Sequence, residues 1–111
     1  MVSTKDDINK VIIDNQVQLK SLGAKSFGLF GSFARNEANE DSDVDMIVEF
    51  RDGQKTYDNF IELAELLENL LGRRVELVTE SSLSKYIKPH IQKEVIYVPI
   101  DLWVASTYSG W

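Results

Sequence analysis

The sequence predicts an α/β (α+β) fold in which helices flank a sheet. Two segments repeat apolar residues at helical spacing, and three short apolar runs have the composition of strands. A length of 111 residues leaves room for one sheet and a few helices, but not for two independent cores. We therefore expect a single folded domain.

The first half of the predicted fold contains a helix, a strand and a short helix. Apolar residues three, four and seven apart predict an amphipathic helix from about Asp6 to Leu22. Residues 25–30 are short and apolar and end at Gly31, which predicts a buried strand followed by a tight turn. Residues 32–42 are small and polar, so a short helix and then a turn are expected there.

The second half begins with the clearest strand, Asp43–Phe50, which starts with acids on alternate positions and becomes continuously apolar. A loop at Arg51–Gln54 precedes a strongly periodic helix over residues 60–71, which Gly72 closes. The alternation in Arg74–Thr79 predicts another strand. The remaining expectation is a further helix capped at 81–83 and interrupted by Pro89, then a last apolar run over 95–102.

Composition excludes several classes of function. The formal charge of -6 and the pI near 4.7 argue against general binding of nucleic-acid backbones, which requires clustered Lys and Arg. The absence of cysteine and the single histidine, His90, exclude thiolate chemistry and a multi-histidine zinc site. There is no leader-like start, and no apolar run nears the roughly 20 residues that span a bilayer. A cytoplasmic protein without membrane or direct nucleic-acid contacts is expected.

The segment most informative about chemistry runs from Gly31 to Asp45 and reads GSFARNEANEDSDVD. Gly31 and Ser32 lie where a strand is expected to turn into a helix. Outward-pointing backbone amides at such a turn can bind a phosphate, and the Ser32 hydroxyl can add a hydrogen bond. Arg35 is either a further phosphate contact or an ordinary exposed arginine. Lys88 and His90 are interpreted as surface residues rather than nucleotide contacts.

Three acidic residues complete the candidate site. Asp43 and Asp45 are two apart on the predicted strand, so both carboxylates are expected on the same face, about 6 to 7 Å apart at Cα. Glu76 is flanked by apolar residues in the predicted strand 74–79, where a charge is unusual unless that face is a site. Hard oxygen ligands in this arrangement suit Mg²⁺, and two such ions would support in-line displacement on a triphosphate.

Gly31-Ser32, ten intervening residues and Asp43-Val44-Asp45 resemble the motif of the polymerase-β-like nucleotidyltransferases. The longer pattern, which includes Ser42-Asp43-Val44-Asp45-Met46-Ile47-Val48, is similar to their minimal nucleotidyltransferase (MNT) branch, the antitoxin partners of HEPN-domain toxins. The likeness covers roughly residues 5–98. It implies the polymerase-β-like fold, a mixed sheet of about four strands with flanking helices, and a domain over 1–98 followed by an aromatic tail over 99–111.

The resemblance also implies a function. Members of this branch transfer AMP from ATP to a tyrosine of the HEPN ribonuclease, a protein adenylyltransferase activity that silences the toxin. On this chain it implies nucleotide binding at Gly31 and Ser32, with Arg35 as a candidate, and metal binding and catalysis at Asp43, Asp45 and Glu76. ATP is then the substrate, Mg²⁺ the cofactor and a HEPN toxin the hetero-oligomeric partner.

Two departures from the family pattern and two alternatives remain. The third acid is usually aspartate, and Glu76 is one methylene longer. Asn36 stands where glycine is common, although asparagine tolerates a positive φ better than most residues. A non-catalytic antitoxin that neutralises by binding, and nucleotidyl transfer to a small molecule, are the competing functions. The tail, with Trp103, Tyr108 and Trp111, is either disordered or a docking patch for a partner.

Overall fold

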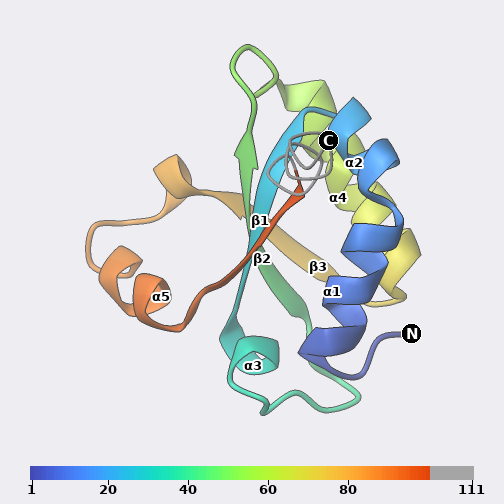
Figure 1. The fold of residues 1–111 in the computed structure, drawn as a ribbon. Coiled ribbons are helices and arrows are strands. Elements are labelled where there is room, and N and C mark those ends of the chain that lie inside the picture. Colours follow the sequence, from blue (N-terminus) through green and yellow to red (C-terminus); the bar gives the residue numbers. More distant parts are fainter. Residues whose placement is uncertain (101–111) are drawn as a thin grey trace, which may run out of the picture.

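The computed structural model describes residues 1–100 of the chain. Within them the chain forms five α-helices, four strands and one short 3₁₀ turn (Figure 1). In order these are α1 (Lys5–Asp14), α2 (Gln16–Ser21), β1 (Ala24–Phe30), α3 (Gly31–Ala34), β2 (Val44–Phe50), α4 (Tyr57–Leu71), β3 (Val75–Thr79), η1 (Glu80–Ser82), α5 (Lys88–Glu94) and β4 (Ile96–Pro99).

The four strands form one mixed sheet in the order β3-β2-β1-β4. β1 pairs antiparallel with β2 on one side and with β4 on the other, whereas β2 and β3 are parallel. The parallel pair requires a crossover, and α4 supplies it. The expectation of a mixed sheet of about four strands with flanking helices is confirmed.

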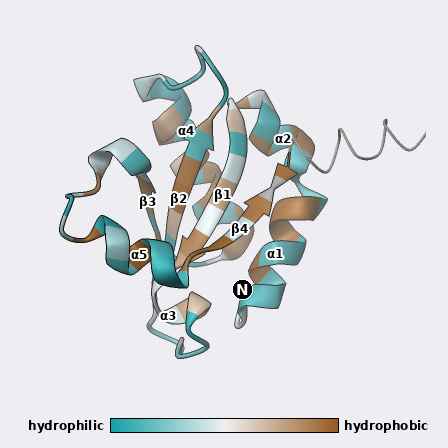
Figure 2. Cartoon of the chain, turned by 60° about the vertical axis from the view of Figure 1, so that its left-hand side comes forward, coloured by the Kyte–Doolittle hydropathy of each residue, from teal (hydrophilic) through white to brown (hydrophobic). Residues whose placement is uncertain are grey.

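One face of the sheet is covered by helices and holds the core. Figure 1 shows α1, α2 and α4 together on one side of the sheet and α5 on the other. Alternate strand residues point into the covered side and are buried, as are the inner residues of the helices. In Figure 2, β2 and β4 are coloured mainly hydrophobic and α5 mainly hydrophilic. The fully buried side chains include Phe27, Phe33, Ile8, Ile12, Leu19, Met46, Leu63, Leu67, Leu71, Ile100 and Val44.

The helix ends follow capping rules that the sequence carries. Thr4 and Asp7 form a reciprocal capping box at the start of α1, with the Thr4 hydroxyl accepting from the Asp7 amide at 3.2 Å. Thr56 caps α4 with a single bond, in which its hydroxyl accepts from the Asn59 N–H at 3.1 Å. Gly72 ends α4 in the left-handed conformation, with φ of 69°, as its position predicts.

The predicted continuous helix over residues 6–22 is two helices, and that expectation is corrected. α1 ends at Asp14 and α2 begins at Gln16, with Asn15 at φ -114° between them. The Asn15 side chain donates from Nδ2 to the carbonyl oxygen of Val11 at 2.8 Å. Asparagine competes for backbone groups in this way and favours a break in the helix, although the apolar stripe continues through it.

The prediction that Pro89 interrupts a helix is wrong, because Pro89 lies in the first turn of α5. A proline is tolerated at that position, since its missing N–H would have no partner inside the helix. The expected cap at 81–83 is instead the end of η1. The last apolar run forms β4, and Ile100 after it is buried. Residues 101–111, with Trp103, Tyr108 and Trp111, lie outside the described residues.

Among residues 1–100, no helix combines the length and the apolar character that a membrane crossing requires.

Candidate active site

The predicted acids gather where β2 and β3 begin. Asp45 in β2 and Glu76 in β3 are partners in the parallel register, so the two side chains stand beside each other on one face of the sheet. Asp45 is half-buried and Glu76 is exposed. Asp43 lies one residue before β2, is exposed, and is close enough for its charge to act on Asp45. The structure therefore brings the three predicted carboxylates together.

Asp45 is the electrostatic centre of this group. The pKa of the Asp45 carboxyl is raised from 3.8 to about 6, mainly by burial and then by a hydrogen bond with Glu76 and the charges of Glu76 and Asp43. The charge of Arg35 opposes the rise. A divalent cation bound beside Asp45 would favour its ionised form and so offset this rise in the pKa.

The three acids alone do not form a complete metal cage. Within residues 1–100 there is no group of three or more His, Cys, Asp or Glu side chains arranged to hold an ion by themselves. Mg²⁺ commonly takes one or two protein carboxylates and completes its shell with water and substrate phosphate oxygens. The donor chemistry of Asp43, Asp45 and Glu76 fits such a partly open site.

The predicted phosphate turn lies directly against Asp45. Gly31 joins β1 to α3 with φ of 75°, a conformation that favours glycine. A Cβ at position 31 would collide with the Asp45 carboxylate, so glycine is required here for both backbone and space. Ser32 follows at a half-buried position, and Phe33 anchors the short helix in the core. The turn and the acids thus share one location at the same end of the sheet.

The end of this turn also behaves as the sequence predicts. Asn36 has φ of 60°, and it is the only non-glycine residue with positive φ in residues 1–100. Its N–H donates to the Phe33 carbonyl at 3.2 Å, and the Glu37 N–H donates to the Ser32 carbonyl at 2.8 Å. Asparagine can adopt this conformation at small cost, as the sequence analysis expects for position 36.

Arg35 points back towards this turn but is already engaged by two carboxylates. Its Nη1 donates to Oε2 of Glu94 at 3.0 Å, and its Nε donates to Oε1 of Glu37 at 2.6 Å. The other oxygen of Glu94 accepts from the Gly31 backbone N–H at 3.0 Å. Both partners raise the pKa of the Arg35 guanidinium, which remains charged. Sequence reasoning did not identify Glu94, because it lies 63 residues from Gly31 and no motif connects them.

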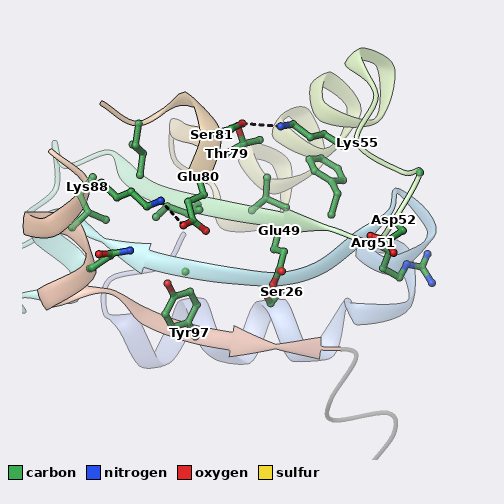
Figure 3. A pocket seen from close by; sticks show the side chains of 18 residues that line it. Ser26, Glu49, Arg51, Asp52, Lys55, Thr79, Glu80, Ser81, Lys88 and Tyr97 are labelled. Carbon is green, nitrogen blue, oxygen red and sulfur yellow. Dashed lines mark hydrogen bonds and ion pairs between the residues drawn. The ribbon is translucent and has the colours of Figure 1, made fainter. Parts of the chain in front are cut away.

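A cavity of about 730 Å³ lies farther along the open face of the sheet. Its floor includes Ser26 and Gly28, and η1 and α5 form one wall (Figure 3). A Lys88–Glu80 ion pair of 2.8 Å joins α5 to η1, and a Lys55–Ser81 hydrogen bond of 2.8 Å joins the loop before α4 to η1. The cavity contains none of the six predicted site residues, but Ile47 places it two residues along β2 from Asp45.

Two residues set aside by the sequence analysis have distinct places. Lys88 lines the cavity and is paired with Glu80, so it is more than a solvated surface residue. His90 is exposed on α5, which agrees with the surface position expected from the sequence. Tyr97 was not singled out by the sequence, yet its ring lies over Gly28 and lines the same cavity. Side chains alternate along β1 and β4, but this alternation places Gly28 and Tyr97 on the open face only once the pairing of the two strands is known.

The sequence and structure match known nucleotidyltransferases. The family model described as "Nucleotidyltransferase domain" matches residues 12–98. The protein adenylyltransferase MntA of Thermococcus cleftensis is 43% identical over 96 residues, which cover 86% of this chain and 96% of that protein. These two matches span the turn and the three acids described above.

Two solved structures share the fold. A toxin-antitoxin structure with AMP-PNP aligns with a TM-score of 0.61 and 24% identity, covering 94% of this chain and 83% of that chain. A structure of tri-AMPylated Shewanella oneidensis HEPN toxin in complex with MNT antitoxin aligns with a TM-score of 0.56 and 20% identity, covering 81% of this chain and 71% of that chain. At these identities the likeness shows a common fold.

Proposed function

The chain belongs to the nucleotidyltransferase domain family, and from that premise we propose that it transfers AMP from ATP to a tyrosine of a partner HEPN ribonuclease and so neutralises it. The observation that carries this proposal is the meeting of Asp43, Asp45 and Glu76 with the Gly31 turn at one end of the sheet. The close similarity to a protein adenylyltransferase supports a protein as acceptor and AMP as the transferred group.

In this proposal the β1–α3 turn binds the triphosphate. The Gly31 backbone can approach a phosphate closely because the residue has no side chain, and the Ser32 hydroxyl follows at a half-buried position. Arg35 is held beside the same turn and carries the positive charge that a triphosphate requires. The hard oxygens of Asp43, Asp45 and Glu76 would hold Mg²⁺. The ion would supply charge neutralisation for the triphosphate and the leaving pyrophosphate.

The chemical step is a single displacement at the α-phosphorus. The acceptor tyrosine oxygen forms the new O–P bond, the bond to the β-phosphate oxygen breaks, and pyrophosphate leaves with that electron pair. Glu76 accepts the proton of the acceptor hydroxyl in this proposal, and its exposed position beside Asp45 supports that role. The acceptor approaches across the open face of the sheet, where the cavity beside Ile47 leaves space for a partner segment.

The experiment that tests this function mixes the chain with its neighbour-encoded partner, α-labelled ATP and Mg²⁺. We expect label on the partner, loss of ribonuclease activity, and a labelled tyrosine in the digested product. The Asp43→Asn, Asp45→Asn double variant should bind the partner but transfer no label. Full neutralisation by that variant would instead support the binding-only antitoxin, and label that appears only on a small molecule would support the third function.

Two finer points belong to the same proposal. ATP and two Mg²⁺ ions are proposed as substrate and cofactor, within the coarser finding that the family acts on nucleotides and typically uses a divalent metal. A cytoplasmic location is proposed because ATP and an RNA-cleaving partner meet there. We further propose that the nucleotidyltransferase domain, expected over residues 1–98, extends to Ile100, because Pro99 belongs to β4 and Ile100 is buried in the core.

A further inference from the structure

Glu94 has no role in the proposed reaction, yet it contacts two groups of the proposed nucleotide site. It is the last residue of α5, and its side chain is 27% exposed. One carboxylate oxygen accepts from the Gly31 N–H at 3.0 Å, and the other accepts from Arg35 Nη1 at 3.0 Å. Glu94 therefore joins α5 to the β1–α3 turn through two charge-assisted hydrogen bonds.

Glu94 accepts hydrogen bonds from the Gly31 N–H and the Arg35 guanidinium. These are the groups that are proposed to bind the phosphates of the nucleotide. A carboxylate and a phosphate present similar anionic oxygens to a backbone N–H or a guanidinium group. The Gly31 N–H has one proton to donate, so it cannot serve the Glu94 oxygen and a phosphate oxygen at full strength together. A bound triphosphate would also bring its negative charges next to the Glu94 carboxylate, which is unfavourable over so short a distance.

We propose that Glu94 is an internal competitor for the phosphates of the nucleotide, so that nucleotide binding displaces it and releases α5 from the β1–α3 turn. This inference rests on the proposed function, since it takes the Gly31 turn as the phosphate site. In the free chain Glu94 contacts the β1–α3 turn. When the nucleotide binds, its phosphates replace the Glu94 carboxylate in that contact.

Displacement of Glu94 would reach the acceptor side of the site. α5 contributes Lys88, Ile91 and Gln92 to the wall of the cavity on the open face. The residue after Glu94, Val95, lies against Gly28 in the neighbouring strand. A change at the end of α5 would therefore alter the cavity beside the acids, and nucleotide binding would be coupled to the shape of the acceptor space.

The first measurement is calorimetric titration of the full chain with a non-hydrolysable ATP analogue and Mg²⁺. Glu94→Gln keeps the size of the side chain but removes its charge, and we expect binding about 3- to 10-fold tighter than in the wild type. Glu37→Gln is the matched control, because Glu37 contacts the same guanidinium at 2.6 Å through Arg35 Nε. That variant should change affinity by less than about twofold.

The second measurement follows the contact itself by amide NMR. In the wild type, adding the analogue should shift the Gly31 signal together with those of residues 93–95, whereas in Glu94→Gln the Gly31 signal should differ before any nucleotide is added. Circular dichroism and thermal unfolding establish that both variants are folded. The Gly31 readout does not depend on transfer activity.

The outcomes separate this inference from the proposed function. Unchanged or weaker binding in Glu94→Gln overturns the competitor while leaving the nucleotide site intact. Equal tightening in Glu37→Gln also overturns it, because the effect would then be a general one of charge. Absence of nucleotide binding in every variant would overturn the proposed function and, with it, this inference.

Discussion

Replacement of Asp45 by asparagine should make the folded chain more stable while it abolishes transfer. The folded state raises the Asp45 pKa from 3.8 to about 6, chiefly through burial and then through Glu76 and Asp43. A raised carboxyl pKa means that the folded state binds the proton more tightly than the unfolded state. Ionised Asp45 therefore opposes folding, and an uncharged side chain of the same shape removes that opposition.

The magnitude follows from the shift in pKa. The rise in the Asp45 pKa from 3.8 to about 6 corresponds to roughly 3 kcal/mol of free energy of unfolding. Asp45 is only half-buried, and solvent screening reduces the value to about 1 to 2 kcal/mol. The destabilisation is fully present above pH 6 and disappears as the pH falls below 3.8, since both states are then protonated. Asparagine can also donate a hydrogen bond to Glu76, where two carboxylates must share a proton.

The assay is urea denaturation of the wild type and Asp45→Asn at pH 8 and at several values down to pH 4. We expect the variant to be more stable at pH 8 by about 1 to 2 kcal/mol, a rise in the melting temperature of several degrees for a domain of this size. The difference should shrink steadily between pH 6 and pH 4. A variant that is less stable at pH 8, or a difference that does not depend on pH, would refute the reasoning.

Four other changes test neighbouring parts of the site. Gly31→Ala places a Cβ against Asp45 at φ of 75°, so it should lower the free energy of unfolding by about 1 to 3 kcal/mol and weaken nucleotide binding. An unchanged melting temperature in thermal unfolding would contradict this. Glu76→Gln should slow label transfer about 100-fold or more, whereas Glu76→Asp, which restores the acid usual in the family, should keep most of it. Mg²⁺ at ten times its dissociation constant should stabilise the wild type by about 1.4 kcal/mol and the Asp43→Asn, Asp45→Asn variant much less, as differential scanning calorimetry can measure. Asn36→Gly should change the stability by no more than about 0.5 kcal/mol, but Asn36→Val should cost about 1 to 2 kcal/mol because a β-branched residue resists φ of 60°.

Local sequence signals predicted most of the fold, because side-chain periodicity and helix capping depend on residues that are close together in the chain. The alternation in β2 and the left-handed glycine after α4 are such signals, and both lie where the sequence placed them. The two wrong predictions, a continuous helix over residues 6–22 and a helix interrupted at Pro89, have a physical reason. An apolar stripe continues through a helix break, and a proline is compatible with a first helical turn although not with a helix interior.

The candidate site was predictable only where its residues belong to one motif or to strands with a clear periodicity. Asp43, Asp45 and Gly31 meet this condition, and Glu76 is recognisable as a charge between apolar neighbours in a strand. Glu94 is not, because its contact with Gly31 depends on the pairing of β4 beside β1 and on the place of α5. Long-range contacts of this kind follow from topology, which local patterns do not encode.

The most direct test of the site is paramagnetic broadening of amide NMR signals by Mn²⁺ in the presence of a non-hydrolysable ATP analogue. Mn²⁺ accepts the same oxygen ligands as Mg²⁺ and broadens the signals of nearby residues. We expect broadening centred on residues 31–35, 43–46 and 75–77, and its loss in the Asp43→Asn, Asp45→Asn variant. Broadening centred instead on Glu80 and Lys88 in the cavity wall, or spread evenly over the acidic surface, would contradict a nucleotide and metal site at the Gly31 turn.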